Sequence, residues 1–286
     1  MKVMILGATG MLGHTMARVL ATESDPHDLV LVSRSFDLRP MFPELADTTS
    51  VTGVDVENMD ALIALFAEHR PDVVVNCVGL VKQRSTAEDP LVALPINAML
   101  PLRLERLCEA TGARLIHVST DCVFRGTKGM YSETDLPDAT DVYGKSKQMG
   151  EAKGPKAITL RTSIIGHELN GRAQGLIGWF LSQSGTVRGF SKAVFSGFPT
   201  VELAKIIRDK VLPRPDLSGL YQVASAPINK HDLLQIVAQT YGHDIVIEHD
   251  DKLIIDRSLD GSRFNKETGY VAPEWPELVS RMQRFR

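Results

Sequence analysis

The stretch MKVMILGATGMLG, residues 1–13, decides the fold of this 286-residue chain. A strand-length apolar run leads directly into three glycines with the spacing G-x-x-G-x-x-G. Gly7 permits a tight strand-to-helix turn, Gly10 lets the backbone approach a pyrophosphate, and Gly13 lets the helix pack close to the sheet. The amino terminus of that helix offers N–H groups and a positive dipole end to phosphates. The sequence therefore predicts a dinucleotide site here, which includes Thr9, Met11 and Leu12.

The chain up to about residue 165 alternates apolar strand patterns with helical patterns. Expected strands cover residues 3–6, 29–33, 73–78, 115–119 and 157–162, and expected helices cover residues 12–22, 59–69, 96–111 and 143–153. This order predicts an α/β fold with a Rossmann-like, doubly wound parallel sheet. The strands are continuous apolar runs, which is typical of parallel strands with helices on both faces.

The pattern becomes less regular after about residue 165. We expect a helix at residues 201–211, a strand at 220–224 that returns to the main sheet, and a helix at 231–241, with short strands and turns over 245–286. Two domains are therefore predicted. Residues 1–165, with the return strand at about 219–225, bind the dinucleotide, and residues 166–218 and 226–286 form a smaller substrate-binding lobe.

Composition excludes several classes of protein. The chain is 43% hydrophobic and 23% charged, as is usual for a globular protein, and its net charge of −3 argues against a nucleic-acid binder. No run approaches about 18 uninterrupted apolar residues, so no membrane span is expected. Residues 1–13 lack the layout of a secretory signal, and Cys77, Cys108 and Cys122 lack metal-ligand spacing. A cytoplasmic protein with reduced thiols and no bound metal is expected.

The end of the second expected strand bears on the choice between NAD and NADP. An acid about 20 positions after the glycines would bond the ribose 2′-hydroxyl, whereas an arginine favours a 2′-phosphate. The strand ends Val32-Ser33-Arg34-Ser35, with no acid at that point. Ser33 and Arg34 therefore predict NADP(H) in preference to NAD(H). The alternative is that Arg34 is a solvated surface residue.

Tyr143 and Lys147 are four positions apart, so on a helix they share one face. A free phenol has a pKa of about 10, and a neighbouring ammonium commonly lowers it by about 1–3 units, toward the range used in general acid–base catalysis. The carboxyl ends of parallel strands line the ligand crevice, so Thr120 is expected near the same site. A Tyr–Lys pair is common by chance, but its order after the glycine turn and Thr120 indicates catalysis.

The sequence resembles the dTDP-4-dehydrorhamnose reductase branch of the extended short-chain dehydrogenases. The resemblance rests on residues 7–13, 73–79, 96–97, 119–124, 131–133, 142–147, 150–151 and 199–204. It is good over the first two thirds of the chain and looser over the last third. It implies NADPH-dependent reduction of a 4-keto group on a nucleotide-activated 6-deoxy sugar, in a cytoplasmic enzyme of polysaccharide biosynthesis that could form a homodimer.

The resemblance also implies roles for individual residues. Thr120 would orient the carbonyl, and Tyr143 would donate the proton with the help of Lys147. Asp55 would contact the adenine, and Asn97 would support the site. Tyr143 and Lys147 are expected to contact the cofactor as well, and Lys147 could hold the nicotinamide ribose. Further residues expected at the cofactor are Val56, Cys77, Val78 and Gly79. Those expected at the substrate, besides Thr120, are Val81, Lys82, Gln83, Asp121, Cys122, Arg161, Phe195 and Arg263. Structural ion pairs for the two arginines, and a place in the core for Phe195, are the alternatives.

Two departures from the family pattern leave the sugar open. Cys122 stands where rhamnose reductases usually carry an aromatic residue, and the loop at residues 194–198 also differs, so a UDP-linked, N-acetylated 4-keto sugar fits equally well. Sugar dehydratases typically carry a glutamate at the position of Cys122, which disfavours elimination. An epimerase of the same superfamily remains an alternative. A non-catalytic, cofactor-bound regulatory subunit is another, although the intact Thr120–Tyr143–Lys147 set argues against it.

Overall fold

The structure is a computed structural model that describes residues 1–22, 27–81, 85–169 and 175–286. The chain divides into two compact units. The first consists of Met1–Ser119, Thr140–Leu160 and Ala204–Leu220, and the second of Thr120–Ala139, Arg161–Leu203 and Tyr221–Arg286. The domain boundaries expected from the sequence, at residues 165, 218 and 226, stay a prediction.

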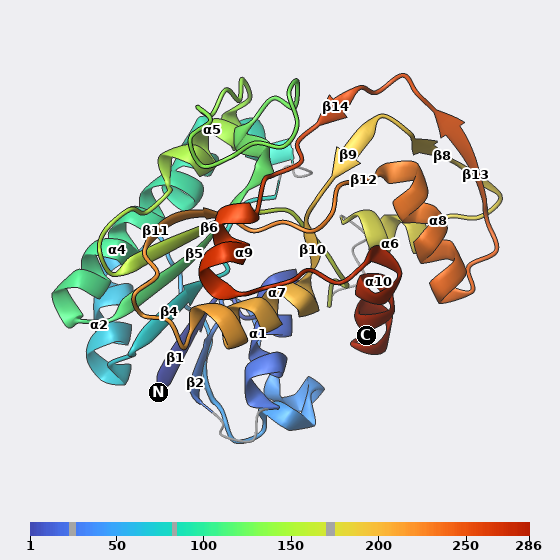
Figure 1. Ribbon diagram of the computed structural model, residues 1–286. Helices are drawn as coiled ribbons and strands as arrows, with labels where there is room; N and C mark the ends of the chain where they lie inside the picture. Colours follow the sequence, from blue (N-terminus) through green and yellow to red (C-terminus); the bar gives the residue numbers. More distant parts are fainter. Residues whose placement is uncertain (23–26, 82–84, 170–174) are drawn as a thin grey trace. The chain divides into compact units, whose positions relative to one another are not determined.

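A seven-stranded sheet runs through the Rossmann-like part of the chain, in the order β11-β6-β5-β4-β1-β2-β3 (Figure 1). Its strands are β1 (Lys2–Leu6), β2 (Asp28–Val32), β3 (Thr49–Val51), β4 (Val73–Asn76), β5 (Arg114–Thr120), β6 (Ala157–Thr162) and β11 (Gly219–Gln222). Strand β1 pairs in parallel with both β2 and β4, and β4 pairs in parallel with β5. The predicted parallel α/β sheet is therefore confirmed. The strand order reverses between β1 and β4, where doubly wound folds bind their ligands.

Alternate side chains of the central strands build one hydrophobic cluster with the helices α2 (Met59–His69) and α4 (Leu100–Thr111). The strand residues in this cluster are Met4, Leu6, Val30, Val32, Val74 and Leu115. Successive side chains of a strand point to opposite faces, so α2 and α4 cover one face of the sheet. The residues between them, such as Ile5, Leu31 and Val75, are buried as well. The helix α1 (Met11–Ala21) contacts β1 and β2. The continuous apolar runs thus reflect strands covered on both faces.

Two helices of the first unit differ from the expected ranges. The helix expected at residues 96–111 begins earlier, because Asp89 caps α3 (Pro90–Ala93), which continues through a π-helical turn, η4 (Leu94–Met99), into α4. The helix expected at residues 143–153 is shorter: α5 (Val142–Met149) ends where Gly150 forms its carboxyl-terminal cap. The short edge strand β3 was not among the strands expected from the sequence.

The second unit contains three small sheets, with strand orders β10-β7, β12-β9-β14 and β13-β8. Their strands are β7 (Ile164–Ile165), β8 (Thr186–Phe190), β9 (Ala193–Phe195), β10 (Phe198–Pro199), β12 (Ile228–Asn229), β13 (Val246–Asp250) and β14 (Ile255–Asp256). The helices are α6 (Leu176–Leu181), α8 (Lys230–Tyr241), α9 (Ser262–Thr268) and α10 (Trp275–Arg284). The helix α7 (Thr200–Ile206) passes into the first unit and continues as a π-helical segment, η6 (Ile207–Val211).

The short strands expected over residues 245–286 are present as β13 and β14, but the sequence-based prediction missed the helices α9 and α10. The helix α10 buries Trp275, Leu278, Val279 and Met282, which recur at helical spacing. Its exposed side carries an ion pair between Glu277 and Arg281, one turn apart. Both signals were present in the sequence.

The structure bears on two expectations drawn from composition. Within the described residues, none of the helices combines the length and the apolar character needed to cross a lipid bilayer. All three cysteines have free thiols; Cys108 is buried, whereas Cys77 and Cys122 are half-buried. Burial raises the pKa of the Cys77 and Cys108 thiols to about 12, so both are neutral at physiological pH.

The contact between α1 and the turn before it yields a stability prediction. A Cβ atom built on Gly13 would lie 2.1 Å from the Gly7 carbonyl oxygen, so even an alanine requires the helix to move away. We expect Gly13→Ala to lower the free energy of unfolding by about 2 kcal/mol or more, measured by urea denaturation. Gly53→Ala is the control, because Gly53 has a φ of 78° and no atom of the described residues lies within 4 Å of an added Cβ. Backbone strain alone costs about 1–2 kcal/mol there. Equal losses in both variants would contradict the close approach of α1.

Candidate active site

The turn after β1 presses against the segment after β4. Gly7 has a φ of 77°, and a Cβ there would lie 3.0 Å from Val78 Cγ2 and 3.2 Å from the carbonyl carbon of Cys77. The Gly7 carbonyl oxygen accepts a hydrogen bond of 2.9 Å from the Gly10 N–H. Three residues predicted to bind the cofactor, Gly7, Cys77 and Val78, are therefore brought together at the carboxyl ends of β1 and β4.

The amino terminus of α1 fits a pyrophosphate. Among the described residues, a Cβ on Gly10 would meet a single atom within 4 Å, the Gly7 carbonyl oxygen at 3.2 Å, so these residues leave the space outside the turn open. In the described chain, no side chain caps this helix, and its first turn, which contains Met11, Leu12 and Gly13, carries no acid. The positive end of the helix dipole is therefore not neutralised by a nearby carboxylate, and the residues present suit a dinucleotide.

The end of β2 leaves Arg34 as the residue suited to a 2′-phosphate. Arg34 is exposed, whereas Ser33 is buried and its hydroxyl donates to the Phe36 carbonyl oxygen at 2.7 Å. The next acid along the chain, Asp37, accepts a hydrogen bond of 2.8 Å from Arg39 Nε. This bond lowers the pKa of Asp37 to about 2. The acid is thus held by Arg39, which leaves the cofactor preference inferred from Arg34 standing as a prediction.

Asp55 and Val56 lie in the segment between β3 and α2. Asp55 is exposed, and its Oδ1 accepts a hydrogen bond of 3.0 Å from the Glu57 N–H. Val56 is half-buried and packs against the hydrophobic cluster under α2. Their contact with an adenine stays a prediction.

Lys147 lies on α5, and its ammonium is buried. The residue is 5% exposed, and Nζ donates to the Val118 carbonyl oxygen at 2.9 Å. A Cβ on Gly79 would lie 3.8 Å from the same Nζ, so the predicted cofactor residue Gly79 lies beside this lysine. Burial lowers the pKa of Lys147 to about 8, although Glu151 opposes the shift. The lysine is therefore charged at neutral pH, but it loses its proton more readily than a lysine in water.

Tyr143 lies on the first turn of α5, one turn before Lys147, and is half-buried. Asp141 fixes the start of this helix, because its Oδ1 accepts a hydrogen bond of 2.7 Å from the Gly144 N–H. The predicted helix therefore places the phenol and the ammonium on one face, as their spacing requires.

Asn97 ties this helix to the segment after β4. Its Oδ1 accepts a hydrogen bond of 3.0 Å from the Leu80 N–H, and its Nδ2 donates to Ser146 Oγ at 3.2 Å. Ser146 Oγ in turn donates to the Tyr143 carbonyl oxygen at 2.8 Å. Asn97 is fully buried and lies in the π-helical turn η4, a type of turn that is frequent at functional sites. The supporting role expected for Asn97 is consistent with these bonds.

Thr120 is the last residue of β5 and lies in the second unit. Its Oγ1 accepts a hydrogen bond of 3.1 Å from the Cys122 N–H and lies 3.2 Å from Asp121 Oδ1, to which it donates. Asp121 is 7% exposed, and burial raises the pKa of its carboxyl, although the nearby charge of Arg257 opposes the shift. The three predicted substrate residues at positions 120–122 thus form one hydrogen-bonded group.

Two cations beside this group, Lys230 and Arg257, were missed by the sequence analysis. Arg257 Nε donates to the Phe124 carbonyl oxygen at 2.7 Å, and Nη1 lies 3.8 Å from Cys122 Sγ. Lys230 Nζ lies 4.8 Å from the ring centroid of Phe195. Arg257 follows Cys122 by 135 positions, and no local motif marks either cation, so only the folded chain reveals them.

The remaining predicted substrate residues have diverse surroundings. The Arg161 guanidinium lies 5.2 Å from the centroid of the Phe124 ring. Arg263 forms an ion pair of 3.0 Å with Glu267 and lies over the Tyr221 ring, so the structural alternative for Arg263 is realised here. Their contacts with a substrate stay predictions, as does that of the exposed Val81. Lys82 and Gln83 lie outside the described residues.

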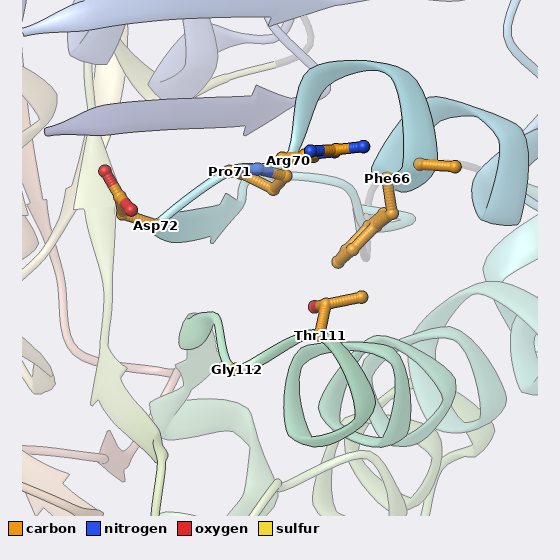
Figure 2. A pocket seen from close by; sticks show the side chains of 7 residues that line it. Phe66, Arg70, Pro71, Asp72, Thr111 and Gly112 are labelled. Atoms are coloured by element: carbon orange, nitrogen blue, oxygen red, sulfur yellow. The ribbon is translucent and has the colours of Figure 1, made fainter.

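A pocket of about 510 Å³ lies elsewhere on the first unit (Figure 2). Its lining residues are Phe66, Ala67, Arg70, Pro71, Asp72, Thr111 and Gly112. Asp72 directly precedes β4, so the pocket lies at the amino ends of the parallel strands. The glycine turn follows the carboxyl end of β1, at the opposite edge of the sheet. The pocket is therefore separate from the candidate site.

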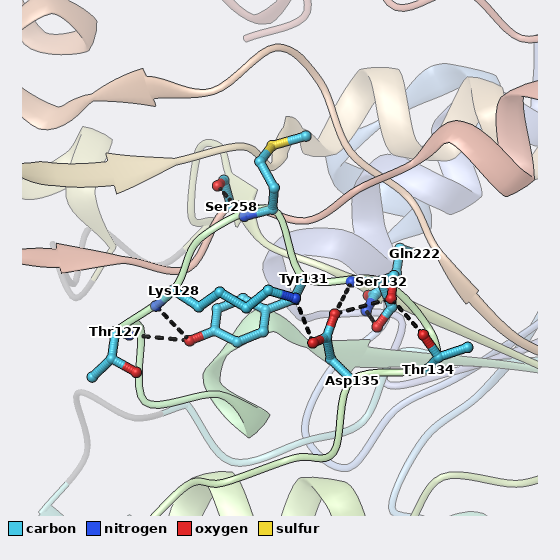
Figure 3. A network of polar contacts seen from close by, with 9 residues as sticks. Thr127, Lys128, Tyr131, Ser132, Thr134, Asp135, Gln222 and Ser258 are labelled. Atoms are coloured by element: carbon cyan, nitrogen blue, oxygen red, sulfur yellow. Dashed lines mark hydrogen bonds and ion pairs between the residues drawn. The ribbon is translucent and has the colours of Figure 1, made fainter.

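A polar network holds the loop that follows Phe124 in the second unit (Figure 3). The Tyr131 hydroxyl oxygen accepts a hydrogen bond of 3.1 Å from the Lys128 N–H, and the Lys128 ammonium pairs with Asp135. The Ser132 N–H donates to Asp135 Oδ2 at 2.7 Å, and Gln222 Nε2 donates to the Ser132 carbonyl oxygen at 3.1 Å. Residues 131–133, which carry part of the family resemblance, therefore anchor this loop.

Known proteins match this chain over much of its length. The family model described as RmlD substrate binding domain matches residues 1–244. A dTDP-4-dehydrorhamnose reductase of Aggregatibacter actinomycetemcomitans is 30% identical over 167 residues, which cover 57% of this chain and 51% of the relative. Methionine adenosyltransferase 2 subunit beta of Mus musculus is 31% identical over 150 residues, 52% of this chain and 41% of the relative. The chain thus spans about half the length of the curated relatives it matches.

A solved structure shares the fold. The dTDP-4-dehydrorhamnose reductase of Bacillus anthracis in complex with NADP superposes with a TM-score of 0.79, at 20% identity, over 99% of this chain and 98% of the other. The expected resemblance to these reductases is confirmed. Because the family model covers most of the sequence, including the glycine turn, Thr120, Tyr143 and Lys147, this chain belongs to the RmlD substrate binding domain family.

Proposed function

We propose that this protein is a cytoplasmic, NADPH-dependent reductase that reduces a 4-keto group on a nucleotide-activated 6-deoxy sugar, in the manner of dTDP-4-dehydrorhamnose reductases. The observation that carries the proposal is the Lys147 ammonium, buried one helical turn from Tyr143 and held by the Val118 carbonyl oxygen. Burying an ammonium costs free energy. A subunit that only binds the cofactor has no use for a buried charge beside a tyrosine. An acid–base catalyst does use it, because the charge stabilises a phenolate.

The chemistry divides between the cofactor and the chain. The nicotinamide, when bound, supplies a hydride to the carbonyl carbon. In this proposal Tyr143 donates its phenolic proton to the ketone oxygen, and Lys147 stabilises the phenolate that remains. The Thr120 hydroxyl orients the carbonyl. The product is an alcohol, and the phenol regains its proton from solvent.

The cofactor is held, in this proposal, by the glycine turn and by the end of β2. The backbone N–H groups of the first turn of α1, at Met11–Gly13, bind the pyrophosphate, and Arg34 binds the 2′-phosphate. Support comes from the open space at Gly10, from the absence of an acid in the described first turn of α1, and from the Bacillus anthracis relative, which is described with NADP.

A cofactor-bound regulatory subunit is the second candidate function, because one relative is a subunit of methionine adenosyltransferase. The buried Lys147 beside Tyr143 favours the reductase. Elimination is disfavoured, since position 122 carries a thiol in contact with Arg257 and not a carboxylate.

Substitution of the proposed proton donor separates the two candidates. We expect Tyr143→Phe to lower kcat about 100-fold or more against dTDP- or UDP-linked 4-keto-6-deoxy sugars, because the phenylalanine has no proton to give. The affinity for NADPH, measured by fluorescence titration, should change far less than kcat, because in this proposal the glycine turn and Arg34 hold most of the cofactor. Tyr241→Phe is the control, because Tyr241 bonds His167 in the second unit. Full activity of Tyr143→Phe would refute the reductase.

The cofactor preference is tested at Arg34. We expect Arg34→Ala to weaken NADPH binding about 10-fold or more while NADH binding stays the same, because only NADPH carries the 2′-phosphate. The measurement is the ratio of the two dissociation constants. Arg106→Ala, which removes an exposed arginine from α4, should leave the ratio unchanged. An unaltered ratio in Arg34→Ala would show that Arg34 is a surface residue.

The buried ammonium also predicts how stability depends on pH. The pKa of Lys147 is about 8 in the folded protein and 10.5 for a free lysine, so the unfolded chain binds more protons between these values. The cost of burying the ammonium is present below about pH 8 and disappears as the pH rises toward 10.5. Relative to wild type, Lys147→Met should therefore gain on the order of 2 kcal/mol on going from pH 10 to pH 7, measured by urea denaturation without cofactor. The exposed Lys145→Met should show no such change, and a flat difference for Lys147→Met would contradict the burial.

A further inference from the structure

The second unit gathers two cations around one carboxylate. Asp121 is buried, and the positive charges of Arg257 and Lys230 both act on it. Among the described residues, neither cation forms an ion pair with Asp121, so both lie near the carboxylate without direct contact. The group therefore carries an excess positive charge in a partly desolvated place, next to Thr120.

The three-stranded sheet β12-β9-β14 brings these side chains together. Val194 on β9 pairs with Asn229 of β12 on one side and with Asp256 of β14 on the other. Lys230 and Arg257 directly follow these two partners, so they start from neighbouring positions across the sheet. Figure 1 shows β14, β9 and β12 side by side in this part of the chain. The pairing of β9 thus fixes the backbone positions from which both cationic side chains extend.

The Arg257 guanidinium already has partners. Nε donates to the Phe124 carbonyl oxygen at 2.7 Å, and Nη1 contacts Cys122 Sγ at 3.8 Å. The Cys122 side chain in turn forms a hydrogen bond with Asp121. Arg257 is therefore fixed to the segment that follows Thr120, and its planar group leaves part of its hydrogen-bonding capacity for a ligand.

Within the described part of the chain, the Lys230 ammonium has no hydrogen-bond acceptor. The side chain is half-buried, and Nζ lies 4.8 Å from the Phe195 ring centroid, a distance typical of a cation–π contact. Across the described residues, its ammonium has no hydrogen bond, although it carries three donors. Lys230 is also the first residue of α8, where the helix dipole disfavours a positive charge. The ring contact and the nearby charge of Asp121 offset these effects only in part, because neither accepts a hydrogen bond from the ammonium among the described residues, and an anionic oxygen could accept one.

We propose that Lys230 and Arg257 form a cationic subsite that binds an anionic oxygen group of the substrate beside Thr120. Lys230 supplies the direct contact, and Arg257 positions the loop at residues 120–124 and adds charge. The inference rests on the proposed function in taking the ligand to be a nucleotide sugar. The diphosphate is the source of anionic oxygens in a 6-deoxy sugar nucleotide. A ring carboxylate, which replaces the C6 methyl group in a nucleotide uronate, is the other source that the same cations could bind. Phe195 was expected at the substrate. In this proposal its ring instead holds the Lys230 ammonium through the cation–π contact.

The test is calorimetric titration of the protein saturated with NADPH, which occupies the dinucleotide site. The probes are inorganic pyrophosphate, UDP-glucose and UDP-glucuronate. Lys230→Met removes the charge and keeps the length of the side chain, and Lys230→Arg restores the charge. Lys192→Met is the matched control, because Lys192 is an exposed lysine of the same unit, paired with Asp251. Thermal melting checks that each variant is folded.

We expect Lys230→Met to weaken at least one probe about 10-fold or more, and Lys230→Arg to restore most of the affinity. Equal losses for all three probes identify the diphosphate as the ligand. A loss confined to UDP-glucuronate identifies a sugar carboxylate, which supports the subsite and counts against the 6-deoxy sugar of the proposed function. Loss of pyrophosphate binding alone, with no UDP-sugar bound by wild type, supports the subsite and counts against a UDP-linked substrate. Affinities of Lys230→Met equal to those of Lys192→Met, or no binding of any probe to wild type, would overturn the proposal.

Discussion

The Lys147 ammonium, buried against the Val118 carbonyl oxygen, is the interaction on which the rest of the candidate site depends. A charge removed from water is tolerated only where fixed acceptors replace the solvent. The end of β5 supplies that acceptor, and Glu151 supplies an opposite charge. Because α5 must lie where this bond can form, Tyr143 is held in place as well. The position of the phenol thus follows from the burial of the lysine.

The segment after β4 completes this arrangement from two sides. Asn97 accepts a hydrogen bond from its backbone at Leu80 and donates to Ser146 on α5. The same segment lies against the glycine turn, where Val78 would touch any side chain added at Gly7. The dinucleotide turn and the Tyr–Lys helix are therefore linked through one short stretch of chain. A reductase needs such a link, because hydride and proton must reach adjacent atoms of one carbonyl group.

Local sequence predicted the parts of the fold that local physics determines. The glycine turn, the first strands and the Tyr143–Lys147 helix all follow from periodicity, apolar runs and the conformational freedom of Gly7. The sequence did not predict the site residues Lys230 and Arg257. They approach Asp121 only because β9 pairs with β12 and β14, which lie far from Asp121 along the chain. The helix α10 was not predicted either, although its apolar residues recur at helical spacing in the sequence. The π-helical turn at Asn97 has no sequence rule that distinguishes it from an ordinary helix.

The protonation of the Lys147 side chain tests the burial of its ammonium most directly, and nuclear magnetic resonance can observe it. Lysine labelled with ¹⁵N at Nζ, with Lys147→Arg used to assign the signal, reports the pKa of this ammonium in the folded protein. The Lys147 signal is expected to titrate at about pH 8. A Lys147 signal that titrates near 10.5, the value of a free lysine, would mean that the ammonium is solvated, and the arrangement around Tyr143 described here would be incorrect.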